Sequence, residues 1–261
     1  YAALGTAVLW HHGGDDAVPA ADEMRALRTV FAWSLVPGLA ATLALWRWVK
    51  DAPPRARPAE HDDGQPAALP RRFYVFLAAV TLFTLGNSSD LFLVFYAQTR
   101  FGLGLGWVIA LWIVLHLSKV AFSVPGGRLS DLYGRRRAIV AGWIVYVAVY
   151  ATMPLVGALT AFCALLVLYG AYYGLTEGAE RALVADAVPP EARGGAYGLY
   201  HGAVGLAALP ASLLFGVFWA ALGPQTAFLI GASLAAGAVG VLVAGGSGRV
   251  SGNGGRAIPT T

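Results

Sequence analysis

A short basic run between two long apolar stretches constrains the fold of this chain most. The stretches cover residues 106–124 and 138–156, and each approaches the roughly 20 apolar residues that a membrane-crossing helix needs. The run between them, GRLSDLYGRRR, occupies residues 127–137. Two apolar helices joined by so short a link must turn back at one membrane face, and the arginines favour the cytoplasmic face. Asp131 is a lone carboxylate among these cations.

The run 127–137 resembles the signature loop of the major facilitator superfamily, G-x-L-[AS]-D-R-[FY]-G-R-[RK]-[RK]. The matching positions are Gly127, Leu129, Ser130, Asp131, Tyr133, Gly134, Arg135, Arg136 and Arg137. Leu132 stands where the family usually has arginine, which puts one contact of the loop in doubt. The alternative is an ordinary basic cytoplasmic loop. Agreement in spacing, residue types and flanking apolar stretches favours the resemblance.

The composition is that of a membrane protein. Hydrophobic residues make up 57% of the 261 residues and charged residues 12%, whereas a soluble domain has about 25% charged residues. We therefore expect an all-α integral membrane fold. The net charge of +4 does not indicate a nucleic-acid partner, because the cations cluster in alternate loops, as in membrane proteins.

The apolar stretches predict about seven transmembrane helices. Residues 27–49 form the first complete span, residues 50–70 a cytoplasmic linker, and residues 71–244 a six-helix bundle. The glycine-rich residues 245–261 are expected to form a flexible cytoplasmic tail. Residues 1–10 are apolar but too short to span. The resemblance implies that they end a truncated fifth helix, that 71–244 is the C-terminal half of a facilitator-type bundle, and that the N-terminal half is missing.

Several breaks divide the predicted bundle. The span 73–97 carries an unusually polar break, Gly86-Asn87-Ser88-Ser89-Asp90. Pro125-Gly126 is expected to end the helix over 106–124. The stretch 138–156 is almost wholly apolar and is expected to face lipid. The remaining predicted spans are 158–185, 197–222 and 226–244.

Four ionisable residues lie inside predicted spans: Asp90, His116, Lys119 and Glu177. A charge in the membrane costs at least about 2.5–3.5 kcal/mol, so each is a functional candidate. One interpretation is that Asp90, with Asn87 and His116, lines a cavity that binds substrate or a proton. The other is that these groups only tie helices together. Depth estimates from the helical rise also allow a structural pair between Lys119 and Glu177.

The resemblance implies a charge network at the cytoplasmic face. It assigns gating roles to Asp131 and Arg181, with Glu177 or Glu180 as relay, and an ion pair there would close that face. The alternative is a set of solvated charges worth under about 1 kcal/mol each. The residues of this predicted gating motif are Gly127, Asp131, Gly134, Arg135, Arg136, Glu180 and Arg181.

Tyr169, Tyr172, Tyr173 and Thr176 follow helical spacing and share one face of their predicted helix. Such a face suits a cavity for aromatic or amphipathic solutes. Packing between helices is an equally good interpretation of the same pattern.

The sequence thus indicates a secondary transporter that moves a small solute by alternating access, coupled to protons and exporting drug-like or amphipathic compounds. An uptake symporter, a sensor or scaffold, and a membrane-embedded enzyme using His116 or His201 remain alternatives. No Gly-Lys-Ser/Thr phosphate loop and no His-Glu-x-x-His motif occurs, so no cofactor or metal is expected. We expect a multi-pass protein, in the cell inner membrane if the source is bacterial.

Overall fold

The chain is helical, with no strand, throughout the part that the computed structural model describes, residues 21–48 and 69–245. The predicted helix end at 1–10, nearly all of the predicted linker and nearly all of the predicted tail lie outside these residues. The helices are α2 (Ala21–Trp48), α3 (Arg71–Gly86), α4 (Asp90–Phe101), α5 (Leu105–Tyr133), α6 (Arg135–Thr152), α7 (Leu159–Ala187), α8 (Arg193–Leu222) and α9 (Pro224–Gly245).

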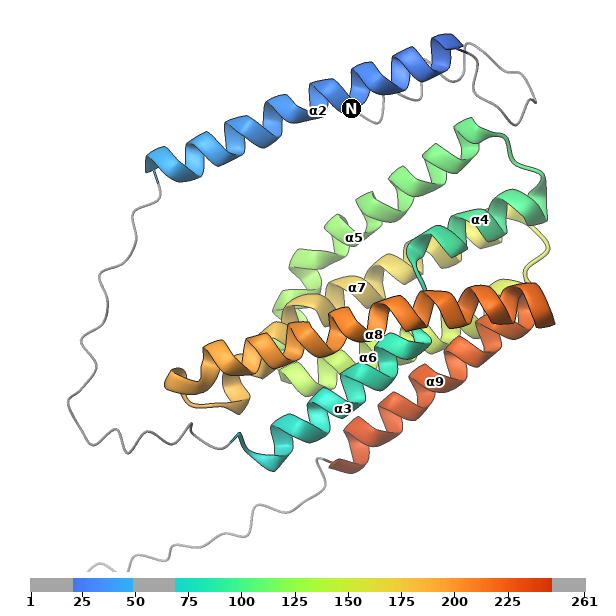
Figure 1. The fold of residues 1–261 in the computed structure, drawn as a ribbon. Coiled ribbons are helices and arrows are strands. Elements are labelled where there is room, and N and C mark those ends of the chain that lie inside the picture. Colours follow the sequence, from blue (N-terminus) through green and yellow to red (C-terminus); the bar gives the residue numbers. More distant parts are fainter. Residues whose placement is uncertain (1–20, 49–68, 246–261) are drawn as a thin grey trace, which may run out of the picture. The chain divides into compact units, whose positions relative to one another are not determined.

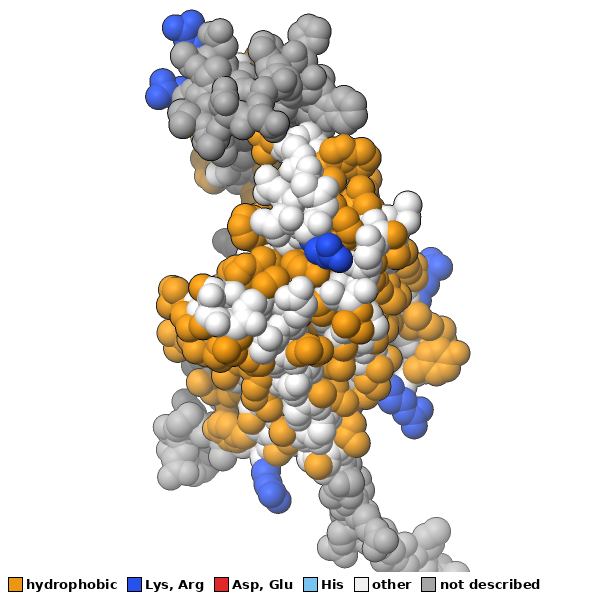
Figure 2. Space-filling model, turned by 90° about the vertical axis from the view of Figure 1, so that its right-hand side faces the viewer, with side chains coloured by type: hydrophobic (Ala, Val, Ile, Leu, Met, Phe, Trp, Pro, Cys, Tyr) orange, Lys and Arg blue, Asp and Glu red, His pale blue; other side chains and the backbone are white. Residues whose placement is uncertain are grey.

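Six segments of the described chain are long and apolar enough to cross a membrane. They are Arg71–Phe101, Leu105–Tyr133, Arg135–Leu155, Leu159–Ala187, Pro190–Leu222 and Pro224–Gly245. Helix α2 is not among these six, so the further span expected at 27–49 stays a prediction. The molecular face in Figure 2 is covered mainly by hydrophobic side chains, as a surface in lipid requires. The predicted all-α membrane fold is confirmed.

The chain divides into two units. One contains α2, α4 and α5 up to Leu117, and the other contains α3, α5 from Ser118, and helices α6 to α9. Within the second unit α6 packs against α7 and α9, α3 packs against α8 and α9, and α8 packs against α7 and α9 (Figure 1).

The core of the second unit is aromatic, and α6 supplies much of it. Trp143, Tyr146 and Tyr150 recur at helical spacing and are fully buried. Phe83 of α3 stacks on Trp143, with ring centroids 4.6 Å apart. The expectation that 138–156 faces lipid is therefore wrong for this face of α6. Apolar composition did not reveal this, because lipid is as apolar as a core and both faces of a membrane helix can look alike.

Helix α5 continues through Pro125 to Tyr133, so the prediction that Pro125-Gly126 ends it is wrong. A proline is tolerated in a membrane helix because its surroundings can satisfy the backbone group that it leaves unpaired. Gly126 also meets α7 at Gly174, and a Cβ on either glycine would overlap the facing backbone. The chain reverses at a single residue, Gly134, whose φ of 93° favours glycine.

The close approach of α5 and α7 predicts that Gly174→Ala destabilises the protein. The added methyl group would collide with the Phe122 carbonyl, and overpacking costs about 1–3 kcal/mol. Gly178→Ala is the matched control one turn away on α7, because a Cβ there meets no atom within 4 Å. Thermal unfolding in detergent should show a lower Tm for Gly174→Ala alone. Equal midpoints for the two variants would contradict this packing.

Candidate functional site

The polar break predicted at residues 86–90 interrupts a membrane helix. Helix α3 ends at Gly86 and α4 begins at Asp90. The break is tied to α6 by two tyrosine hydroxyl groups. Tyr146 Oη donates to the Gly86 carbonyl at 2.9 Å, and Tyr150 Oη lies 3.0 Å from Ser88 Oγ. The predicted break is therefore confirmed as a helix interruption, and its polar groups are held by α6.

Asn87 lies in this interruption and has one unpartnered atom. Its Nδ2 group donates to Tyr172 Oη at 3.2 Å, whereas its buried Oδ1 atom accepts no hydrogen bond from any described residue. Buried acceptors are nearly always paired in folded proteins. The amide oxygen of Asn87 can therefore accept a hydrogen bond from a bound solute or a water molecule.

The four residues of the predicted tyrosine face have different surroundings. Tyr169 and Tyr172 are buried, and their rings contact Tyr146 of α6. Thr176 donates to the Tyr172 carbonyl of its own helix. Tyr173 is half-buried, and the Nζ atom of Lys119 lies 3.8 Å from its ring centroid. Packing thus explains Tyr169 and Tyr172, while Tyr173 holds a membrane cation.

Lys119 and Glu177 are held by different groups. Lys119 lies over the Tyr173 ring, and Glu177 Oε1 accepts from Arg181 Nη2 at 2.6 Å. An arginine four residues further along the same helix is a nearer partner for Glu177 than a lysine on another helix. Glu177 thus pairs within its own helix, whereas Lys119 of α5 contacts a tyrosine ring of α7.

The other two ionisable candidates lie in the first unit. Asp90 is the first residue of α4, where a carboxylate is stabilised by the helix dipole. His116 Nδ1 lies 2.9 Å from the Trp112 carbonyl of its own helix, and its ring lies 4.6 Å from the Trp112 ring. The contacts of His116 are those of a locally packed histidine.

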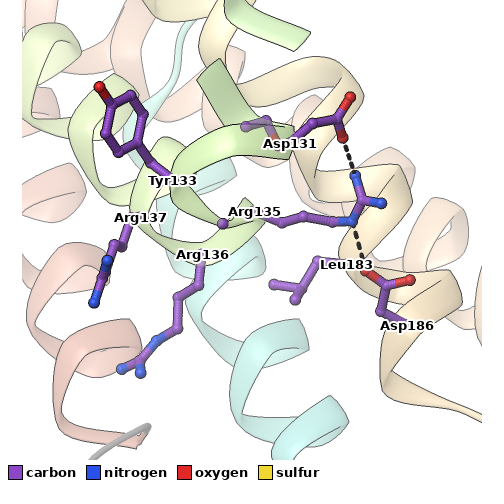
Figure 3. Close-up of a pocket in the computed structure, with 9 residues that line it drawn as sticks. Asp131, Tyr133, Arg135, Arg136, Arg137, Leu183 and Asp186 are labelled. Carbon is purple, nitrogen blue, oxygen red and sulfur yellow. Dashed lines mark hydrogen bonds and ion pairs between the residues drawn. The ribbon is translucent and has the colours of Figure 1, made fainter. Parts of the chain in front are cut away.

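Arg135 bridges two carboxylates at the signature turn (Figure 3). Its Nη1 atom lies 3.0 Å from Asp131 Oδ1 at the end of α5, and its Nε atom lies 2.5 Å from Asp186 Oδ2 near the end of α7. The side chains of Arg135, Asp131 and Asp186 are 34%, 69% and 54% exposed. Water screens such pairs, so each is worth under about 1 kcal/mol.

The predicted relay residues have other partners than those that the resemblance implies. Arg181 pairs with Glu177, whereas Asp131 pairs with Arg135. Glu180 accepts from Trp143 Nε1 at 3.2 Å and from Tyr200 Oη at 2.8 Å. Glu180 therefore joins α6, α7 and α8 through neutral donors. Asp186, which follows the predicted gating motif in the sequence and was not included in it, pairs with Arg135.

Arginines cap the ends of two helices near the signature turn. Arg136 Nη2 donates to the carbonyls of Leu242 and Val243 at the end of α9. Arg72 donates through Nε and Nη2 to the Ala187 carbonyl at the end of α7, at 3.3 and 3.1 Å. The last carbonyls of a helix lack partners within it and favour cations. These two arginines thus fix the ends of four helices.

The two glycines of the predicted gating motif differ. Gly134 has the positive φ that reverses the chain, whereas a Cβ at Gly127 would meet no atom within 4 Å. No group of three or more His, Cys, Asp and Glu side chains within residues 21–48 and 69–245 is placed to hold a metal ion.

Replacing Glu180 should cost more stability than replacing Glu177. Glu180→Ala leaves the buried Trp143 and Tyr200 donors unpaired, at about 1–3 kcal/mol each. Glu177→Ala removes a half-exposed pair worth under about 1 kcal/mol. Thermal unfolding of both variants in the same detergent measures the difference. If Glu177→Ala were the more damaging change, the assigned roles of the two carboxylates would be reversed.

Comparisons with known proteins agree with this architecture. A family profile described as Major Facilitator Superfamily matches residues 105–253. An uncharacterized MFS-type transporter of Methanocaldococcus jannaschii is 34% identical over 172 residues, which are 64% of this chain and 43% of that protein. The chain thus spans less than half the length of this relative. With six segments suited to crossing a membrane in the described part, the chain is an integral multi-pass membrane protein and belongs to the major facilitator superfamily.

Proposed function

We propose that the chain is part of a secondary transporter that moves a small solute across the membrane by alternating access. The observation that carries this proposal is the helix interruption at Asn87, with its buried, unpartnered amide oxygen. Irregular backbone at membrane depth is tolerated where protein buries it or where it lines a water-filled cavity. Interrupted helices supply substrate and ion sites in many secondary transporters. Membership of a transporter family favours this function over a sensor or an enzyme.

The solute pathway would involve the residues near the interruption and the exposed part of the tyrosine face. Asn87 supplies a hydrogen-bond acceptor, and Tyr173 supplies an aromatic ring that already binds the cation of Lys119. The buried side chains of Tyr169 and Tyr172 pack against α6 and support this face. An acceptor and an aromatic ring suit amphipathic or cationic organic solutes. We therefore favour export of drug-like compounds, with uptake of a metabolite by symport as the second candidate.

Gating would use the weak ion pairs at the signature turn. Arg135 is shared by Asp131 and Asp186, and all three side chains are partly exposed. Pairs of this kind break at low cost, so helices joined by them can move apart as rigid bodies. The resemblance assigns such a latch to Arg181. In this structure Arg135 of α6 forms ion pairs with carboxylates of α5 and α7, and Glu177 is a local partner of Arg181.

Proton coupling through Asp90 predicts that Asp90→Asn abolishes transport driven by a pH gradient. The amide retains the shape of the side chain but cannot carry a proton across the cycle. The measurement is accumulation of ethidium, an aromatic cation, in vesicles that contain the full-length protein and an imposed pH gradient. Glu191→Gln, at an exposed acidic residue before α8, is the control. Accumulation by Asp90→Asn at the wild-type rate would remove Asp90 from the mechanism.

The distribution of basic residues predicts that the signature turn faces the cytoplasm and that Gly157 faces the opposite side. Single cysteines at Arg137 and Gly157 in a Cys163→Ser background test this topology. A membrane-impermeant maleimide applied to intact cells should label the cysteine at 157 and label the cysteine at 137 only after the cells are opened. Labelling of both in intact cells would overturn the orientation and, with it, the gating role of the turn.

A further inference from the structure

A membrane cation lies at the middle of two neighbouring helices. Lys119 is the middle residue of α5, and Tyr173 is the middle residue of α7. Each helix has 29 residues, a length of about 43 Å at the α-helical rise, which matches a bilayer with its headgroups. The two residues therefore lie near the membrane midplane, where an ionisable side chain is expensive and marks a functional site.

The ammonium group of Lys119 is held by tyrosine rings of α7. Its Nζ atom lies 3.8 Å from the ring centroid of Tyr173 and 5.8 Å from that of Tyr169. Both distances are within the range of about 6 Å over which a ring attracts a cation. Tyr169 is buried, whereas Tyr173 and Lys119 are half-buried, so the nearer ring is the more accessible of the two.

The backbone beside Lys119 is fixed, but the lysine side chain is not. Ser118 Oγ donates to the Val167 carbonyl of α7 at 2.7 Å, and a Cβ on Gly170 would collide with Ser118. A lysine side chain is a flexible four-carbon stem that ends in a compact charge. It can therefore leave the Tyr173 ring by rotation of its own bonds, while α5 and α7 stay in contact.

The helix interruption lies at the corresponding level of its own span. Gly86 is the middle residue of the segment Arg71–Phe101, and the neighbouring Asn87 donates to Tyr172 Oη at 3.2 Å. The Tyr172 ring lies 5.6 Å from the Tyr173 ring. Substrate sites of secondary transporters lie near the bilayer midplane, at interrupted helices. The ring that the lysine occupies is thus next to a tyrosine that contacts the interruption.

We propose that Lys119 is a built-in competitor for a cationic solute at the Tyr173 ring. Two cations cannot share one ring face, because like charges a few ångströms apart repel each other strongly in a medium less polar than water. Without solute the ammonium group occupies the ring, and a solute cation binds only when the lysine side chain turns away. Lys119 thereby sets the affinity of the site for cations. This inference rests on the solute pathway proposed above.

The test measures binding of ethidium to the full-length protein in dodecyl maltoside by equilibrium dialysis. Lys119→Met removes the charge, so we expect ethidium to bind about ten-fold more tightly once competition for the cation–π contact is lost. Lys119→Gln, a second uncharged variant, should show the same gain, whereas Lys119→Arg retains a cation and should bind as the wild type does. Arg128→Gln, at an exposed residue of α5, removes one positive charge elsewhere and should leave the affinity unchanged.

Two further comparisons separate charge from bulk and identify the ring. Phenanthridine, the parent ring system of ethidium, is uncharged at neutral pH, so Lys119→Met should leave its affinity unchanged. In the Lys119→Met background, Tyr173→Phe should retain the gain for ethidium, and Tyr173→Leu should lose it because no aromatic ring remains. Tyr74→Leu, at an exposed tyrosine of α3, is the control.

The proposal is overturned if the uncharged variants bind ethidium no more tightly than the wild type, if phenanthridine gains equally, or if Tyr173→Leu leaves the gain intact. Ethidium flux into vesicles is a separate measurement. Tighter binding by Lys119→Met, with no flux by any variant, would contradict the transport function and support the competition at the ring. Flux by the wild type, with equal ethidium affinity in the two proteins, would support transport and contradict the competition.

Discussion

The structure depends on satisfying backbone groups wherever a membrane helix stops. An unpaired carbonyl in an apolar medium costs several kcal/mol, so a helix end that lies away from water needs a donor from elsewhere in the chain. The Tyr146 hydroxyl serves the carbonyl at the end of α3. Arg136 and Arg72 serve the ends of α9 and α7. These bonds join helices that are distant in sequence, so the donors that satisfy the helix ends also fix the bundle.

Much of this architecture could be predicted from the sequence, because hydrophobic length and turn residues are local signals. The order of apolar and polar residues along the chain predicts the spans within 71–244 and the break at Asn87. The buried face of α6 could not be predicted, because Trp143, Tyr146 and Tyr150 are as compatible with lipid as their neighbours. The prediction that the helix ends at Pro125 was wrong for a related reason. A proline breaks a helix in water, whereas a helix packed through Gly126 tolerates it.

The site was predictable only in part, since side-chain partners depend on geometry that no spacing encodes. The roles of Asn87 and Tyr173 in a solute pathway stay predictions, and Tyr172 Oη accepts a hydrogen bond from the Asn87 amide. Arg181 was expected to reach Asp131 and instead holds Glu177, its neighbour four residues away. Asp186 lies at the end of the predicted span, where it looks like an ordinary loop charge. Only the fold brings it to Arg135.

The two charge arrangements at this end of the bundle differ in what they can do. Glu180 is fixed by neutral donors on α6 and α8, so moving those helices apart would leave three polar groups unpaired. The ion pairs of Arg135 with Asp131 and Asp186 are instead partly exposed, so breaking them costs little. A hinge motion needs one contact that stays fixed and another that breaks easily. The α6–α7–α8 contact at Glu180 fits the first, and the turn at Arg135 fits the second.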